Sequence, residues 1–205
     1  MRCRILGLGA LAAAGVLLLS ACGAARPITY YSLDPPEVTP AAQRLEAALL
    51  VGHITAPLVY RDTRIIYRTG PNAMGLYEEH RWSEPPAAMF EEMLLHALRQ
   101  SHRYKSVQLL TSNAHGDYVL RGRVERFEQV DGSPVVARVW LRLSLYDLKN
   151  GQTVWNGSYE KDEPASANDF PSIVAALNLN LQKAVLELTA GVDEYLAAHP
   201  QPPAS

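Results

Sequence analysis

The sequence predicts an α/β (α+β) fold, in which a mixed, mainly antiparallel sheet with a C-terminal three-strand meander is packed by two helices. Two observations carry this prediction. Residues 118–125, 137–146 and 152–160 alternate apolar and polar side chains, as strands with one buried face do. Residues 83–100 and 170–195 instead repeat apolar side chains at steps of three and four, as helices do.

Composition indicates one globular domain without a nucleic-acid partner. Of the 205 residues, 48% are hydrophobic and 20% are charged, which excludes a disordered chain and a polytopic membrane protein. The formal net charge is −2 and the 19 Lys and Arg form no cluster, so the basic patch of a nucleic-acid binder is missing. Cys3 and Cys22 both precede the predicted domain, which excludes a disulfide framework, a zinc site and a cysteine nucleophile from it.

The N-terminus has the pattern of an export signal. Arg2 and Arg4 precede an uncharged, apolar run over residues 5–19. A membrane-spanning helix needs about 20 apolar residues, so this run is short for a permanent span. We therefore interpret residues 1–21 as a signal peptide. An uncleaved anchor helix and a simple soluble export signal are the alternatives.

Proline-rich segments flank the predicted domain. Four prolines lie in the segment before it: Pro27, Pro35, Pro36 and Pro40. They favour extended, poorly packed chain, so we expect residues 22–43 to form a spacer between the membrane and the domain. Residues 199–205 have a similar composition and are expected to form a disordered tail. A single domain then spans residues 44–198.

The first half of this domain is expected to contain short strands. Brief alternation predicts them at residues 48–54, 64–67 and 76–81, and Pro71 and Asn72 mark the turn between the last two.

A helix is expected after these strands. Ser83 is a candidate N-cap, and the prolines that follow it are tolerated in a first turn. The apolar stripe of this helix consists of Phe90, Met93, Leu94, Ala97 and Leu98. The helix should end near Gln100, and a further strand should occupy residues 106–110.

The second half is expected to form the meander and a long final helix. Turn residues at 131–134 and 149–151 join the three alternating segments into consecutive antiparallel hairpins. Asn168 or Asp169 caps the final helix. Its apolar stripe is continuous over about seven turns and should cover one face of the sheet: Phe170, Val174, Leu177, Leu181, Val185, Leu188, Val192 and Tyr195.

Catalytic motifs are scarce. Ser158 and Lys161 match the Ser-x-x-Lys pattern of serine acyl-enzymes, but there the pattern opens a helix, whereas here it lies at the end of a predicted strand. A tethered hydrolase that uses this pair is therefore the weakest hypothesis. The six histidines are scattered over separate elements, and no pair has the spacing of metal ligands. We predict no catalytic residues, no metal site and no cofactor.

One row of polar side chains is a candidate partner interface. Arg138, Trp140 and Arg142 lie on the polar side of an alternating segment, and protein interfaces are enriched in arginine and large aromatic residues. The alternative is that the second helix covers this side of the sheet and packs on the arginine stems.

Residues 19–23, Leu-Ser-Ala-Cys-Gly, resemble the bacterial lipobox. The resemblance implies that the Cys22 thiol receives a diacylglycerol thioether, that the chain is cut before Cys22, and that the new amino group receives an amide-linked acyl chain such as palmitate. More than one acyl chain is enough for stable membrane anchoring. Gly23 stands where an Asp would signal retention in the inner membrane, so the resemblance further implies a lipid anchor in the cell outer membrane, facing the periplasm.

The chain resembles the ABC-type transport auxiliary lipoprotein family, which includes the paraquat-inducible lipoprotein C type. Four segments carry the resemblance in addition to the lipobox, and the Leu-rich closing helix also agrees: Tyr30-Tyr31-Ser32-Leu33, Arg64-Ile65-Ile66-Tyr67-Arg68, Arg81-Trp82-Ser83-Glu84-Pro85, and Asp117-Tyr118-Val119-Leu120 followed by Arg126-Phe127-Glu128. Their order and spacing match over nearly the whole chain after Cys22.

The resemblance implies a non-enzymatic, accessory role. Family members work with an ABC permease and ATPase, and with an MCE-domain protein, in systems that move phospholipids or related lipids between membranes. It implies the same partners here, docking of the assembly at the outer membrane, and compatibility with a homo-oligomer. The alternative from another class is a structural lipoprotein that partners an outer-membrane β-barrel or the cell-wall machinery.

Overall fold

A computed structural model of the chain describes residues 26–200. The expected signal peptide (1–21), Cys22 and residues 201–205 of the expected tail lie outside this range. The helices and strands follow one another in the order β1 (Thr29–Tyr31), β2 (Leu45–Val51), the 3-10 helix η2 (Leu58–Arg61), β3 (Arg64–Gly70), β4 (Ala73–Trp82), α2 (Pro86–Gln100), β5 (Tyr104–Leu109), β6 (Tyr118–Val130), β7 (Val136–Asp147), β8 (Gln152–Pro164) and α3 (Phe170–Ala198).

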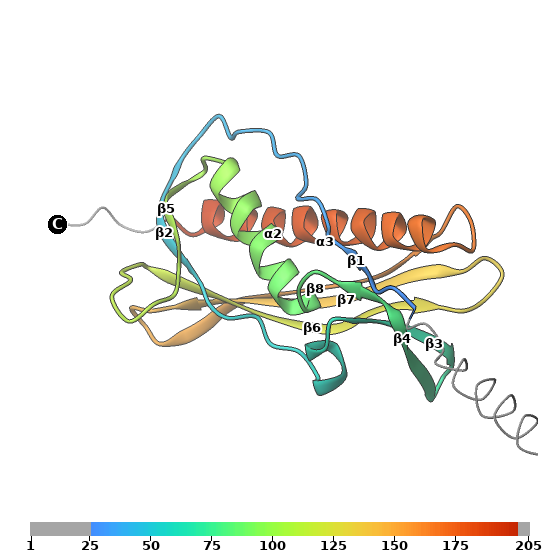
Figure 1. The fold of residues 1–205 in the computed structure, drawn as a ribbon. Helices are drawn as coiled ribbons and strands as arrows, with labels where there is room; N and C mark the ends of the chain where they lie inside the picture. Colours follow the sequence, from blue (N-terminus) through green and yellow to red (C-terminus); the bar gives the residue numbers. More distant parts are fainter. Residues whose placement is uncertain (1–25, 201–205) are drawn as a thin grey trace, which may run out of the picture.

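The architecture has two layers, a sheet and a pair of helices on one of its faces (Figure 1). The strand order is β1-β4-β3-β6-β2-β5, and β7 pairs with β6 and with β8. The strands β6, β7 and β8 form the antiparallel meander, whereas β2 pairs in parallel with both β5 and β6. The predicted fold class, a mixed sheet with a C-terminal meander packed by two helices, is therefore confirmed.

Strand β6 is the centre of the sheet. One of its edges pairs with β7 over its whole length, from Tyr118 opposite Asp147 to Val130 opposite Val136. Its other edge is shared by two strands, because β2 pairs near its start and β3 pairs only with Gln129 and Val130 at its end. One long strand thus connects both parts of the sheet.

The helix-facing side of the meander is the core. Alternate residues of β6 and β7, among them Leu120, Val124 and Leu141, are completely buried. The α3 stripe that covers them is buried at Leu177, Leu181, Val185, Leu188 and Val192. Burial of apolar side chains is the main stabilising contribution to such a packing.

Asp169, one of the two predicted N-cap residues, caps the final helix α3. The Asp169 carboxylate accepts a hydrogen bond from the backbone N–H of Ser172 at 2.8 Å, which makes Asp169 the N-cap. The same hydrogen bond lowers the pKa of the Asp169 carboxyl group. The helix then runs for 29 residues to Ala198.

The start of the first helix differs from the prediction. Helix α2 begins at Pro86 after Pro85, and no side chain caps it, so the predicted Ser83 cap is wrong. Pro85 has extended backbone angles (φ −57°, ψ 147°), and the residue before a proline is also pushed out of the helical region. Ser83 instead donates its backbone N–H to the Tyr31 carbonyl at 2.7 Å, which ties it to β1.

Part of the expected spacer is folded. Residues 29–31 form β1, which pairs in parallel with β4 through Tyr31 opposite Trp82. The Tyr31 ring stacks near Phe170 with a centroid distance of 6.1 Å, and its hydroxyl lies 3.0 Å from His80 Nδ1. Pro36 is buried as well. These apolar contacts outweigh the extended propensity of the proline-rich segment, so the folded unit begins before residue 44.

A buried amide joins α3 to the meander. Asn180 is completely buried; its Oδ1 accepts from the Tyr159 hydroxyl at 2.6 Å, and its Nδ2 donates to the carbonyls of Ala137 and Lys161, each at 2.9 Å. Asn180 thus joins α3 to polar groups of β7 and β8, and its own buried amide has hydrogen-bond partners for both its oxygen and its nitrogen, as buried polar groups require.

Replacing this amide should destabilise the protein. We expect Asn180→Ala to lower the free energy of unfolding by at least about 2 kcal/mol, because it removes three hydrogen bonds and leaves the buried Tyr159 hydroxyl without its acceptor. Urea unfolding followed by circular dichroism measures the change. Asn178→Ala is the matched control, since it removes a neighbouring amide of α3 whose one hydrogen bond, to the Asp34 N–H, is exposed. Equal losses for both variants would contradict this assignment.

Candidate interaction surface

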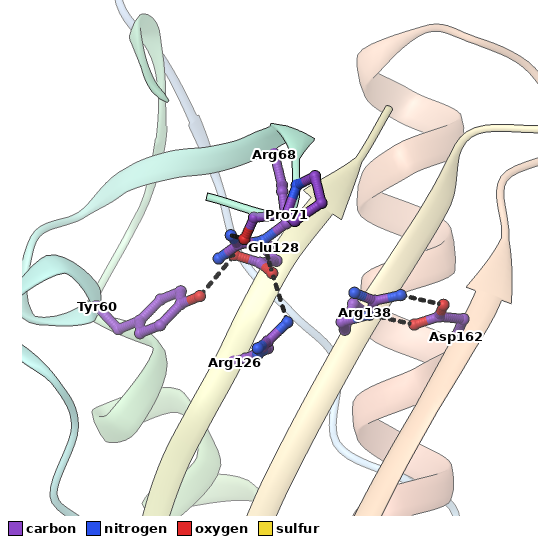
Figure 2. Close-up of polar contacts among 7 residues, drawn as sticks. All are labelled: Tyr60, Arg68, Pro71, Arg126, Glu128, Arg138 and Asp162. Carbon is purple, nitrogen blue, oxygen red and sulfur yellow. Dashed lines mark hydrogen bonds and ion pairs between the residues drawn. The ribbon is translucent and has the colours of Figure 1, made fainter. Parts of the chain in front are cut away.

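The side of the meander that faces away from the helices is the candidate functional surface, which we call the open face. Cross-strand pairing places Arg126 opposite Trp140 and Glu128 opposite Arg138, and Arg138 in turn opposite Asp162. In Figure 2, α3 lies behind the strands, and the side chains of Arg126, Glu128, Arg138 and Asp162 project on the near side. Polar residues fill the positions that alternate with the buried apolar ones.

The structure brings the predicted row onto this open face. Helix α3 packs on the opposite side of the meander, so the alternative in which the second helix covers Arg138, Trp140 and Arg142 is wrong. The Arg142 side chain is 59% exposed and that of Arg138 is 26% exposed. Their role in binding a partner stays a prediction.

Arg138 is fixed by a two-pronged ion pair. Its Nε and Nη2 each donate to a different carboxylate oxygen of Asp162 at 2.7 Å (Figure 2). The hydrogen bonds from this pair raise the pKa of the Arg138 guanidinium. A bidentate arginine–carboxylate pair fixes orientation as well as charge.

Trp140 lies between two arginines. The guanidinium carbons of Arg126 and Arg142 lie 5.7 and 5.9 Å from the centre of its ring system, within the range of cation–π attraction. The Trp140 indole N–H donates to Ser158 Oγ at 3.3 Å. The open face therefore presents an aromatic ring flanked by positive charge.

A buried ion pair closes the far end of the open face, where β3 and η2 meet β6. Arg68 donates to both carboxylate oxygens of Glu128, from Nε at 2.6 Å and from Nη2 at 3.0 Å (Figure 2). The Tyr60 hydroxyl donates to Glu128 Oε2 at 2.6 Å, and Arg126 Nη1 lies 4.0 Å from Oε1. The carbonyl of Pro71 accepts a further hydrogen bond from Arg68 Nη1 at 3.1 Å.

Burial and hydrogen bonding set the charge state of this cluster. The Glu128 side chain is fully buried and that of Arg68 is 9% exposed. Hydrogen bonds to Glu128 raise the pKa of Arg68, and burial, followed by the Glu128 hydrogen bond, raises the pKa of the Tyr60 hydroxyl. Tyr60 therefore stays neutral, and its hydroxyl donates a hydrogen bond to the carboxylate. Both carboxylate oxygens of Glu128 already accept hydrogen bonds from Arg68 or Tyr60. The cluster therefore has a structural role and stabilises the fold.

The sequence pattern does not predict this cluster. Arg68 and Glu128 lie in two different motif segments of the family resemblance, and 60 positions separate them. No local pattern indicates that they meet. In contrast, strand alternation does place Arg121 and Arg123 on the polar side of β6, next to the predicted row.

The structure separates the two residues of the hydrolase hypothesis. Ser158 Oγ lies on the open face beside Trp140 Nε1, whereas Lys161 reaches towards α3, where its Nζ binds Glu187 Oε2 at 2.6 Å. Three residues apart on a strand, they point to opposite sides of the sheet, so Lys161 does not reach the serine hydroxyl. Within residues 26–200, no three His, Cys, Asp or Glu side chains lie close enough together to hold a metal ion.

Removing the buried carboxylate should be far more harmful than removing an exposed one. We expect Glu128→Ala to lower the free energy of unfolding by about 3–5 kcal/mol, because Arg68 is then buried without a counter-charge. Asp162→Ala, the matched control on the same face, should cost less than about 1 kcal/mol, since its ion pair with Arg138 is exposed to solvent. Urea unfolding of both variants provides the comparison, and similar values would contradict the structural role of the cluster.

Comparisons with known proteins agree with the fold and identify the family. A structure of a Xanthomonas campestris protein of the DUF330 family is 23% identical with a TM-score of 0.75, covering 83% of this chain and 98% of that chain. A second solved structure, of an uncharacterized protein, is 15% identical with a TM-score of 0.62, covering 82% and 99%. At these identities the structures show the fold alone. No curated protein matches the chain significantly.

The family itself follows from the sequence match. In the part of the chain that the structure describes, no helix is long and apolar enough to cross a membrane. The family model described as the ABC-type transport auxiliary lipoprotein component matches residues 31–189, which is most of the chain. This range contains nearly all the motif residues on which the resemblance was based. The chain therefore belongs to the ABC-type transport auxiliary lipoprotein family.

Proposed function

We propose that this protein is a periplasmic lipoprotein, anchored in the outer membrane through Cys22, that acts as a non-enzymatic accessory component of an ABC transport system moving lipids between membranes. The family match over residues 31–189 is the observation that carries the proposal. An MCE-domain protein, together with the ABC permease and ATPase, is the proposed partner set, and the energy for transport comes from the ATPase.

The geometry of the open face supports an accessory role. Arg138, Trp140 and Arg142 lie on one strand, and their side chains are held by an ion pair and by contacts with neighbouring rings and charges. Side chains that are already ordered lose little entropy when a partner binds. We propose that this row contacts the protein partner. Separation of Ser158 from Lys161 also removes the only residue pair that suggested a hydrolase.

The proposed anchor depends on a single thiol. Cys22→Ser should abolish acylation and release the protein from the membrane fraction, because the acyl chains supply the membrane affinity. Cys3→Ser is the matched control, and it should leave the protein acylated and in the outer-membrane band of a sucrose gradient. Mass spectrometry of the N-terminal peptide reports acylation. An unmodified, uncleaved N-terminus in the wild type would contradict the anchor.

The proposed partners can be recovered directly. Tagged full-length protein, gently solubilised from membranes, should bring down an MCE-domain protein together with ABC transporter subunits, as identified by mass spectrometry. Trp140→Ala should reduce this recovery about tenfold or more, since aromatic residues at interface centres contribute about 2 kcal/mol or more. Leu179→Ala is the control, because Leu179 is an apolar residue exposed on α3, in the other layer.

Other outcomes of the same experiment separate the proposals. Recovery of only an outer-membrane β-barrel or cell-wall proteins would overturn the transport role in favour of the structural alternative. Undiminished recovery of the MCE-domain protein with Trp140→Ala would keep the transport role and remove the proposed interface row.

A further inference from the structure

The open face contains a hollow beside the proposed partner contact, with which it shares Arg142. It has a volume of about 490 Å³ and lies over the middle of β6, β7 and β8, away from the buried Glu128 cluster. Small-molecule sites in proteins are typically about 300–1,000 Å³. Six of its nine lining residues have polar side chains: Arg121, Arg123, Arg142, Ser144, Asn156 and Ser158.

Positive charge in the hollow exceeds negative charge. Arg123 Nε donates to Glu125 Oε1 at 3.2 Å, and Arg142 contacts the same oxygen. One carboxylate therefore serves two guanidinium groups. Arg121 lies 4.3 Å above the centre of the Tyr146 ring, which is an uncharged partner. Three arginines therefore surround the hollow, and only two of them have a carboxylate partner, which they share.

Other acidic residues of the open face do not offset this excess. Asp162 is held by both prongs of Arg138, and Glu128 is buried against Arg68. Glu160 lies opposite Trp140, one pair further along the strands, and does not line the hollow. The arginines of the hollow keep about two uncompensated positive charges, counted as three guanidinium groups against Glu125.

We propose that this hollow is a binding site for a phosphate group. Guanidinium groups present planar pairs of N–H donors that match the spacing of phosphate oxygens, and three arginines lining one hollow suit a multiply charged oxyanion. The Asn156 side-chain amide lines the same hollow and adds neutral donors. Because the three arginines stand on adjacent antiparallel strands, the sheet fixes their backbone positions before the ligand arrives.

The size of the hollow favours a small phosphate-bearing group over an extended acidic protein segment. The hollow spans the width of three strands, and the Arg126–Trp140–Arg142 arrangement lies at one end. Two sources share this chemistry: free inorganic phosphate and the phosphodiester of a lipid headgroup. The proposal stands on the arginines alone and does not depend on the proposed transport role.

The test is isothermal titration calorimetry on the full chain in non-ionic detergent and phosphate-free buffer. One arm uses inorganic phosphate, and the other uses glycerophosphoglycerol, a soluble phosphodiester headgroup without acyl chains. The wild type should bind at least one probe, and Arg121→Gln and Arg142→Gln should each weaken that binding about tenfold, the usual effect of losing one charge-assisted hydrogen bond. Arg99→Gln, on α2 in the helix layer, is the matched control and should bind as the wild type does.

The two arms distinguish the sources and can overturn the proposal. Binding of glycerophosphoglycerol alone assigns a lipid headgroup, and binding of inorganic phosphate alone assigns free phosphate. If neither probe binds, or if Arg99→Gln weakens binding as much as the two variants of the hollow, the proposal is wrong. Absence of probe binding, combined with loss of partner recovery in Arg121→Gln, would assign the arginines to an acidic protein segment instead. Thermal unfolding of each variant confirms that it is folded.

Discussion

Strand β6 joins both parts of the sheet because its Glu128 carboxylate binds Arg68 and so holds β3 against the C-terminal end of β6. The ladder between these strands is only two residues long, at Tyr67 and Arg68, with one further backbone bond from the Asp131 N–H to the Arg68 carbonyl at 2.8 Å. Such a short pairing contributes little by itself. The ion pair with Arg68 therefore supplies much of the specific attachment.

A buried ion pair is stabilising only when its geometry repays desolvation. Removing two charges from water costs several kcal/mol for each ion, and the mutual attraction compensates only if the remaining lone pairs are also satisfied. Glu128 meets this condition, since Arg68 occupies both oxygens and the Tyr60 hydroxyl adds a second hydrogen bond to Oε2. Tyr60 belongs to η2, so the same carboxylate also positions the segment that precedes β3.

The pattern of the sequence was sufficient to predict the layers but not the junctions between distant segments. Alternation in β6 and β7 predicted their pairing. The alternation also indicates which side of β7 the helix covers. An apolar helix stripe packs on the side of Val139 and Leu141, which leaves Arg138, Trp140 and Arg142 on the open face. Strand β1 was missed because three residues are too short for a period, and its partner lies about 50 residues away. Pairing of Arg68 with Glu128 is equally non-local and leaves no periodic signal.

Strand β1 shortens the segment that joins the proposed anchor at Cys22 to the folded domain. A spacer over residues 22–43 would contain 22 residues and could extend about 75 Å, at about 3.3–3.6 Å for each residue. Since Thr29 already belongs to the sheet, only seven residue steps separate it from Cys22, and their full extension is about 25 Å. If Cys22 carries the acyl chains as proposed, the domain is held close to the membrane by its β1–β4 edge. The covalent reach of this short tether, rather than any charge on the domain, then limits how far the open face can extend from the lipid surface.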